Sequence, residues 1–174
     1  LNYAAEAYLK APNAEAKDIF GASVGVSADT IVVGAQYEAS SQTTITNGST
    51  ASADNSASGP GDATAGAAYV FVRSGAAWAA QAYLKAPNAG VGDRFGTSVG
   101  ISGGTIVVTA TYESSSQTTI TNGATASADN SALNTGAAYV FVRSGATWAA
   151  QAYLKAPNAE AQDDFGISVG ISGD

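Results

Sequence analysis

The chain has 174 residues, of which 45% are hydrophobic and only 12% are charged, and its formal net charge is −7. It contains no cluster of Lys or Arg that could neutralise successive phosphates, so nucleic acid is excluded as a partner. Cys and His are both absent, which removes disulfides, thiolate metal sites and the usual catalytic triads and general base. No run of about 18 apolar residues occurs, so no membrane span is predicted.

The chain is built from tandem copies of one sequence unit. The sequence YLKAPNA occurs at residues 8–14, 83–89 and 153–159, and GAAYVFVRSGA occurs at residues 66–76 and 136–146. The period is 75 residues from the first copy to the second and 70 residues from the second to the third. Since repeat proteins are organised by their repeat rather than by their length, the repeat sets the domain boundaries.

Each repeat is predicted to contain four β-strands. In the first repeat, residues 23–27 alternate Val with small residues, residues 30–37 form an apolar run, and residues 68–73 are mostly apolar on both faces. Residues 78–85 are the most amphipathic, which predicts an exposed edge strand. Pro87 cannot donate to a ladder, so we expect the chain to leave the sheet there and to enter the next repeat.

Four short strands per unit, joined to the next unit by about ten residues, indicate an all-β fold of tandem four-stranded antiparallel blades of a β-propeller. We expect about two complete blades with partial flanking strands. The predicted units are an outer strand of a preceding blade at residues 1–14, blade repeats at 15–89 and 90–159, and the first strand of a third blade at 160–174. Lone strands with open edges are expected at residues 3–10 and 168–172.

A Phe-Gly pair precedes the first predicted strand in every copy. The pairs are Phe20-Gly21, Phe95-Gly96 and Phe165-Gly166, each followed after one residue by SVG(V/I)S. This pattern resembles the FG-GAP repeat, a family that includes the integrin α-subunit head and many bacterial secreted or surface proteins. The resemblance implies a β-propeller at an extracellular or cell-surface location, with roles in adhesion and ligand binding.

Two features depart from the family pattern. The GAP triplet is replaced by residues 34–36, Gly-Ala-Gln, in one copy and by residues 109–111, Thr-Ala-Thr, in the other. The DxDxDG calcium loop of integrin-type blades is absent. The resemblance therefore does not by itself bring calcium to this chain.

Three aspartates recur just before the first strand of each copy and are candidate metal ligands. Asp18, Asp93 and Asp163 could supply carboxylate oxygens to calcium, the one cofactor that the sequence suggests, although calcium needs six to eight ligands. The alternative is that each carboxylate accepts hydrogen bonds from nearby backbone amides and fixes the turn into the strand.

Two polar loops are candidates for ligand binding, because loops on a rigid scaffold often carry function. Residues 39–65 and 114–135 are rich in Ser, Thr, Asn and Asp, and both contain TASADNSA. The candidate contacts for a protein or glycan are Asn47, Asp54, Asn122 and Asp129. The alternative is that these loops are merely solvated or disordered.

Two further groups carry a functional and a structural interpretation. Glu38 with Asp54, and their copies Glu113 with Asp129, could act as the two carboxylates of a glycosidase. The aromatics Trp78 and Trp148, with Tyr83 and Tyr153, could stack on sugars or could pack between neighbouring blades. Without His or Cys, catalysis is not expected, and the chain is predicted not to be an enzyme.

The sequence therefore predicts an extracellular binding or adhesion module. The alternative function is a structural protein that assembles into a ring or filament through open blade edges, since unpaired strands readily bind other strands. The expected partners are a protein or glycan ligand, or further copies of the chain.

Overall fold

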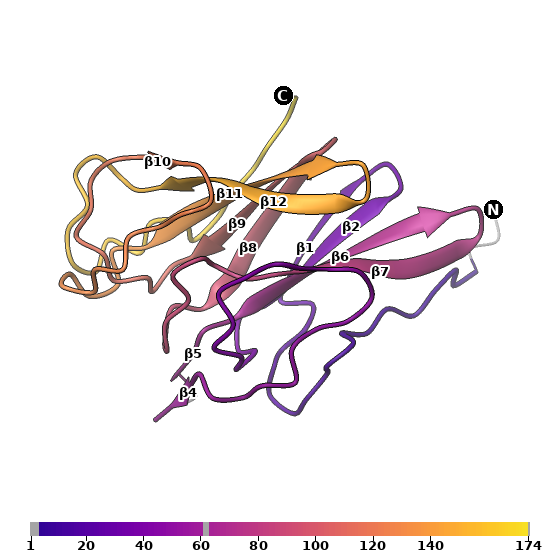
Figure 1. Ribbon diagram of the computed structural model, residues 1–174, viewed down its shortest axis with the longest axis horizontal. Coiled ribbons are helices and arrows are strands. Elements are labelled where there is room, and N and C mark those ends of the chain that lie inside the picture. Colours follow the sequence, from indigo (N-terminus) through magenta and orange to yellow (C-terminus); the bar gives the residue numbers. More distant parts are fainter. Residues whose placement is uncertain (1–3, 61–62, 174) are drawn as a thin grey trace.

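The computed structural model describes residues 4–60 and 63–173, and these residues form strands, turns and loops without a helix (Figure 1). Each repeat folds into one antiparallel five-stranded sheet. Blade 1 has the order β1 (Ser23–Ser27), β2 (Thr30–Ala35), β6 (Ala67–Ser74), β7 (Ala77–Leu84) and β3 (Thr46–Asn47). Blade 2 has the order β8 (Phe95–Ser102), β9 (Thr105–Ala110), β11 (Ala137–Ser144), β12 (Thr147–Leu154) and β10 (Thr121–Asn122). A small separate hairpin joins β4 (Ser58–Gly59) to β5 (Ala63–Thr64).

The predicted fold class is confirmed, because both sheets are antiparallel, propeller-like blades that follow the sequence repeat and do not close into a ring. The four main strands of blade 1 lie where the alternation of residues places them, within two residues at each end. The apolar run at residues 30–37 ends its ladder at Ala35, because the Glu38 amide turns back to donate to the Ala35 carbonyl at 3.1 Å.

Each blade has an aromatic cluster at its centre. In blade 2 the Phe95 ring lies 5.4 Å from Tyr139 and 6.0 Å from Phe141, in edge-on arrangements. Phe20 makes the same contacts with Tyr69 and Phe71 in blade 1. Edge-on aromatic pairs at this spacing add to the stabilisation from burial. Phe20 and Phe95 thus pack on the cores of their own blades, whereas Phe165 of the third pair is 36% exposed.

The glycine after Phe95 serves the neighbouring blade instead. Gly96 has φ +93, and a Cβ there would collide with the Ala67 carbonyl of blade 1. The Gly96 carbonyl accepts a hydrogen bond from the Ser23 hydroxyl at 2.9 Å, and the Phe95 amide donates to the Ala65 carbonyl at 2.9 Å. Backbone from the two blades therefore meets at van der Waals distance, which only glycine permits.

The fourth strand is only in part the exposed edge that its amphipathic pattern predicts. In blade 1 the two-residue strand β3 pairs with the outer side of β7, with Thr46 opposite Tyr83 and Asn47 opposite Ala82. β10 covers β12 in the same way. The prediction is wrong only at this end of the strand, where the polar loop folds back over the sheet and supplies a fifth strand that pairs with two of the eight residues.

The flanking strands expected at residues 3–10 and 168–172 are absent from the described residues, and Tyr3 lies outside them. Residues 168–172 lie along β8, where the Val169 amide donates to the Ser98 hydroxyl at 3.2 Å, but they join no ladder. As parts of a preceding and a third blade, these segments would pair with the other strands of those blades. Assignment of these segments to a preceding and a third blade stays a prediction.

Candidate functional site

The long loops and the inter-blade linker emerge at one end of the sheets. Ala35 at the end of β2 pairs with Ala67, at the start of β6. Leu84 at the end of β7 pairs with Ala68, and Phe95 bridges to Gly66. We call this end, made of residues 36–60, 63–66, 85–95 and 111–136, the loop rim (Figure 1).

A buried ion pair lies beneath the polar loop of each blade. The Lys155 ammonium donates to Glu113 Oε2 at 2.8 Å, to the Thr135 hydroxyl at 2.6 Å and to the Gly136 carbonyl at 2.7 Å. All three of its protons are therefore used. The side chains of Lys155 and Glu113 are almost completely buried. This pair ties the end of the fourth strand to both ends of the loop.

Blade 1 repeats the arrangement with Lys85. Its ammonium donates to Glu38 Oε2 at 3.1 Å, to the Ser40 carbonyl at 2.7 Å and to the Gly66 carbonyl at 2.6 Å. Burial lowers the pKa of Lys85, and the Glu38 carboxylate partly opposes this effect. Glu38 is inaccessible in this position. The two-carboxylate glycosidase interpretation needs accessible groups, whereas Glu38 is enclosed beside Lys85 and Asp54 lies in the solvent-exposed part of the loop.

An asparagine in the linker connects successive blades. The Asn88 amide donates to Glu113 Oε1 at 3.1 Å and to the Ser127 carbonyl at 2.7 Å, and its Oδ1 accepts from the Tyr139 hydroxyl at 2.8 Å. Asn13 makes the corresponding contacts in blade 1. The sequence analysis missed the role of this asparagine, although the repetition of LKAPN was the signal that could have revealed it.

Asp54 and Asp129 hold the polar loops in shape. Asp129 accepts hydrogen bonds from the amide and hydroxyl of Ser116, at 2.8 and 2.7 Å, and from the amide and hydroxyl of Ser131, at 3.2 and 3.0 Å. Asp54 does the same with Ser41 and Ser56. These hydrogen bonds lower the pKa of both aspartates to about 2. The loops are therefore internally braced and not merely solvated.

Asn47 and Asn122 occupy equivalent positions with different surroundings. The Asn47 side chain donates to the Trp148 carbonyl at 3.2 Å and accepts from the Trp148 amide at 2.8 Å, so it binds the backbone of the neighbouring blade. The Trp148 indole is 2% exposed and donates to Gln81 Oε1 at 2.9 Å. Asn122 lies exposed in β10.

Packing between blades, the structural interpretation of the aromatic group, is therefore confirmed for Trp148. Trp78 is partly exposed and donates to Glu6 Oε1 at 3.2 Å. Tyr83 and Tyr153 lie in the blade cores, where their rings are 5.3 Å from those of Tyr69 and Tyr139. Buried rings of this kind leave no face for sugar stacking.

The three candidate metal ligands lie in equivalent turns of successive copies. Each Oδ2 accepts a hydrogen bond from the backbone amide three residues earlier, at 2.9 Å for Asp18 and 2.7 Å for Asp93 and Asp163. Burial raises the pKa of Asp93 to about 7 and also raises the pKa of Asp18. No group of three or more acidic side chains that could hold a metal ion occurs in residues 4–60 and 63–173. A calcium site stays a prediction.

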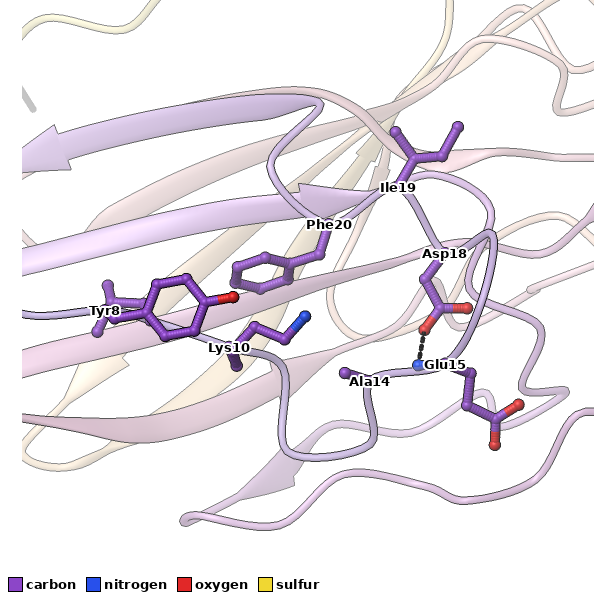
Figure 2. A pocket seen from close by; sticks show the side chains of 8 residues that line it. Tyr8, Lys10, Ala14, Glu15, Asp18, Ile19 and Phe20 are labelled. Carbon is purple, nitrogen blue, oxygen red and sulfur yellow. Dashed lines mark hydrogen bonds between the residues drawn. The ribbon is translucent and has the colours of Figure 1, made fainter.

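A hollow of about 400 Å³ lies on the outer face of blade 1 (Figure 2). Figure 2 shows Tyr8, Lys10 and Phe20 around it, and Asp18 accepting a hydrogen bond from the Glu15 amide. The corresponding residues of the next copy, Tyr83, Lys85, Phe95 and Asp93, are all buried where the end of blade 1 meets the start of blade 2. The hollow is therefore the counterpart of a blade-packing surface and not of an enclosed ligand pocket.

Comparison with known protein families matches the chain to the FG-GAP repeat over residues 3–71 and 78–141. The chain belongs to the FG-GAP repeat family. The resemblance inferred from the three Phe-Gly pairs is thereby confirmed. No curated protein matches the chain.

FG-GAP repeats build propeller-like modules that often act in binding, and the geometry of this FG-GAP chain suits such a role. Its strands and buried ion pairs form a fixed scaffold, and its long loops gather at one rim. No helix long and apolar enough to cross a membrane is found in the part of the chain that the structure describes.

Proposed function

We propose that this FG-GAP chain is part of an extracellular binding or adhesion module whose ligand surface is the loop rim. One observation carries the proposal: both polar loops are fixed by the same set of contacts, with a Lys–Glu pair beneath them and an Asp clamp within them. Loops that are held rigid before binding lose little conformational entropy when they bind.

The composition and the family support the extracellular location. Only 12% of the residues are charged, so Ser, Thr, Asn, Gln and Gly cover much of the surface. Such a surface suits a secreted or cell-surface protein, and FG-GAP repeats are typically extracellular. The expected ligand is a protein or a glycan, and no catalytic step is proposed.

The test is a steric block of the loop rim. The first repeat is five residues longer than the second just before Gly66, so the corresponding place in blade 2, after Ala132, should tolerate an insertion. We would insert five polar residues there and, as a control, after Gly75 in the hairpin at the opposite end. Both variants and the parent chain would be screened against arrays of extracellular proteins and glycans.

We expect the rim insertion to weaken binding at least tenfold and the hairpin insertion to leave it unchanged. Equal effects of the two insertions, or no effect of either, would contradict the proposal. Near-parent unfolding midpoints for both variants are the check that the scaffold is intact.

Self-assembly is the second candidate, and one observation favours it. Blade 1 exposes an apolar face in which Tyr8 is 86% and Val26 63% exposed. Their counterparts in the next copy, Tyr83 at the end of blade 1 and Ile101 in blade 2, are 0% and 8% exposed, because both are packed inside the two-blade unit. An exposed face of this type is a candidate interface, and it replaces the open strand edges that the sequence predicted at residues 3–10 and 168–172.

Light scattering on the purified chain tests this candidate. Uniform multimers or filaments that Val26→Lys converts to monomers would support self-assembly through the apolar face. A parent chain that is monomeric at high concentration would rule it out.

A further inference from the structure

Arg94 lies in the loop rim at the junction of the two blades. Its guanidinium is 4.9 Å from the ring centroid of Tyr37, in blade 1, and 4.3 Å from that of Tyr112, in blade 2. Its backbone amide donates to the Thr64 carbonyl at 3.3 Å. Contact with an aromatic ring on each side holds the planar cation in place.

The hydrogen-bonding capacity of this cation is not used within the described part of the chain. A guanidinium carries five N–H donors, and Arg94 Nε is buried without a hydrogen-bond partner there. Arg73 differs, since it pairs with Glu6 at 3.3 Å and with Asp29 at 2.6 Å. No such ion pair joins Arg94 to a carboxylate of residues 4–60 and 63–173. A buried polar group without a partner is costly and calls for an explanation.

A pocket of about 160 Å³ opens beside this cation. Its wall includes Arg94, Tyr112, Ser114 and two exposed apolar side chains, Val91 at 54% and Leu133 at 60% exposure. Pockets for small molecules usually measure about 300–1,000 Å³. The smaller volume suits a single side chain of a larger partner.

The turn does not need an arginine at this position. Ile19 and Asp164 occupy it in the other two copies, and their φ angles of +51° match the +58° of Arg94. The arginine therefore adds a positive charge that the turn does not require, at one position of the loop rim.

We propose that the pocket beside Arg94 binds the carboxylate of a Glu or Asp side chain in a peptide segment of a protein partner. Arginine favours carboxylates because its parallel N–H groups can donate two hydrogen bonds to one acidic group. This inference rests on the proposed binding function of the loop rim and names its ligand class.

The surroundings favour an acidic peptide over an acidic sugar. Sugars often stack on aromatic faces, but the rings of Tyr37 and Tyr112 each have Arg94 over one face. Val91 and Leu133 instead offer aliphatic contacts to an apolar residue next to the carboxylate. The net charge of −7 repels long acidic runs, so one acidic residue between apolar neighbours is the best match.

The test uses nitrogen-15 NMR of the full chain, with the Arg94 Nε–H resonance and the amides of Gly92 and Asn134 as reporters. The probes are acetyl-Leu-Glu-Leu amide, its Gln analogue and sodium glucuronate, at constant ionic strength. The variants are Arg94→Ile, which copies the first repeat, and Arg143→Ile, which removes the same charge from the opposite end of blade 2. We expect the Glu peptide to shift the reporters in the parent chain and in Arg143→Ile.

The Gln peptide should bind at least tenfold more weakly, and Arg94→Ile should lose the difference between the two peptides while keeping a dispersed spectrum. Equal binding of both peptides, unchanged binding to Arg94→Ile, or stronger binding of glucuronate would overturn the inference. If the rim insertion abolishes binding of a natural partner and Arg94→Ile does not, the binding function stands and only the carboxylate site fails.

Discussion

Removal of the Lys155 ammonium is the most direct test of how the polar loop is held. In Lys155→Met, the Glu113 carboxyl group, in a side chain that is 1% exposed, loses its ammonium partner, and the Gly136 carbonyl loses its donor from Nζ. Loss of one partner of a buried ion pair costs about 3–5 kcal/mol. Since a domain is stable by only about 5–15 kcal/mol, this change should remove a large part of the free energy of unfolding.

The repeat supplies a matched control. Lys10 occupies the same position in the first copy of YLKAPNA but is exposed, so Lys10→Met should change the stability by less than about 0.5 kcal/mol. The measurement is urea unfolding followed by tryptophan fluorescence, because Trp148 is buried between the blades. Lys155→Met with Glu113→Gln should be less destabilised than the sum of the single changes.

The result that would refute this reasoning is a Lys155→Met variant within about 1 kcal/mol of Lys10→Met. Such a result would mean that the loop is held mainly by its Asp clamp and not by the ion pair. An additive double variant would likewise mean that the two groups do not stabilise each other.

Three other changes test the inter-blade contact, the turn aspartate and the loop clamp. Gly66→Ala should lower the free energy of unfolding in urea by about 1–3 kcal/mol more than Gly75→Ala. Both glycines have a positive φ, but only at Gly66 would the added Cβ collide with backbone atoms, those of Phe95. Asp93 keeps its proton in the folded state up to about pH 7, whereas the unfolded chain loses it near pH 4, so stability should fall as pH rises between these values, by up to about 1.4 kcal/mol per unit. Asp93→Asn should remove that part of the slope, and an unfolding series from pH 4 to pH 8 that is parallel for both proteins would contradict it. The pKa of Asp129 is lowered, so its ionised carboxylate stabilises the loop above pH 4, and this stabilisation is lost as pH falls toward 2. Amide hydrogen exchange at Ser116 and Ser131 should therefore speed up, relative to amides outside the loop, as Asp129 becomes protonated.

The repeat and the main strands could be predicted because they depend on local patterns. Alternation in residues 23–27 and the apolar run from Thr30 mark strands whatever their neighbours are, and the copies show that the same pattern recurs in the second repeat. The strands β3 and β10 could not be predicted in this way, because two polar residues carry no period. Their positions depend on where a long loop folds back.

The site could be predicted only in part, for a related reason. Its loops are visible as polar segments, but its contacts join residues that are far apart in the sequence. Asn47 accepts a hydrogen bond from the Trp148 amide, 101 residues away in the sequence, and Arg94 contacts tyrosines from two successive repeats. The difference between Ile19, Arg94 and Asp164, within otherwise similar copies, was the signal in the sequence that could have marked that position.

The two blades show how a fixed scaffold can carry variable loops. The first repeat is longer just before Gly66 and forms the extra hairpin of β4 and β5 there. The Lys–Glu pair and the Asp clamp are nevertheless the same in both blades. Because these contacts lie at the base and middle of each loop, they do not depend on the length of its last part. Changes in that part and at position 94 should therefore alter the loop rim and leave the Lys–Glu pair and the Asp clamp intact.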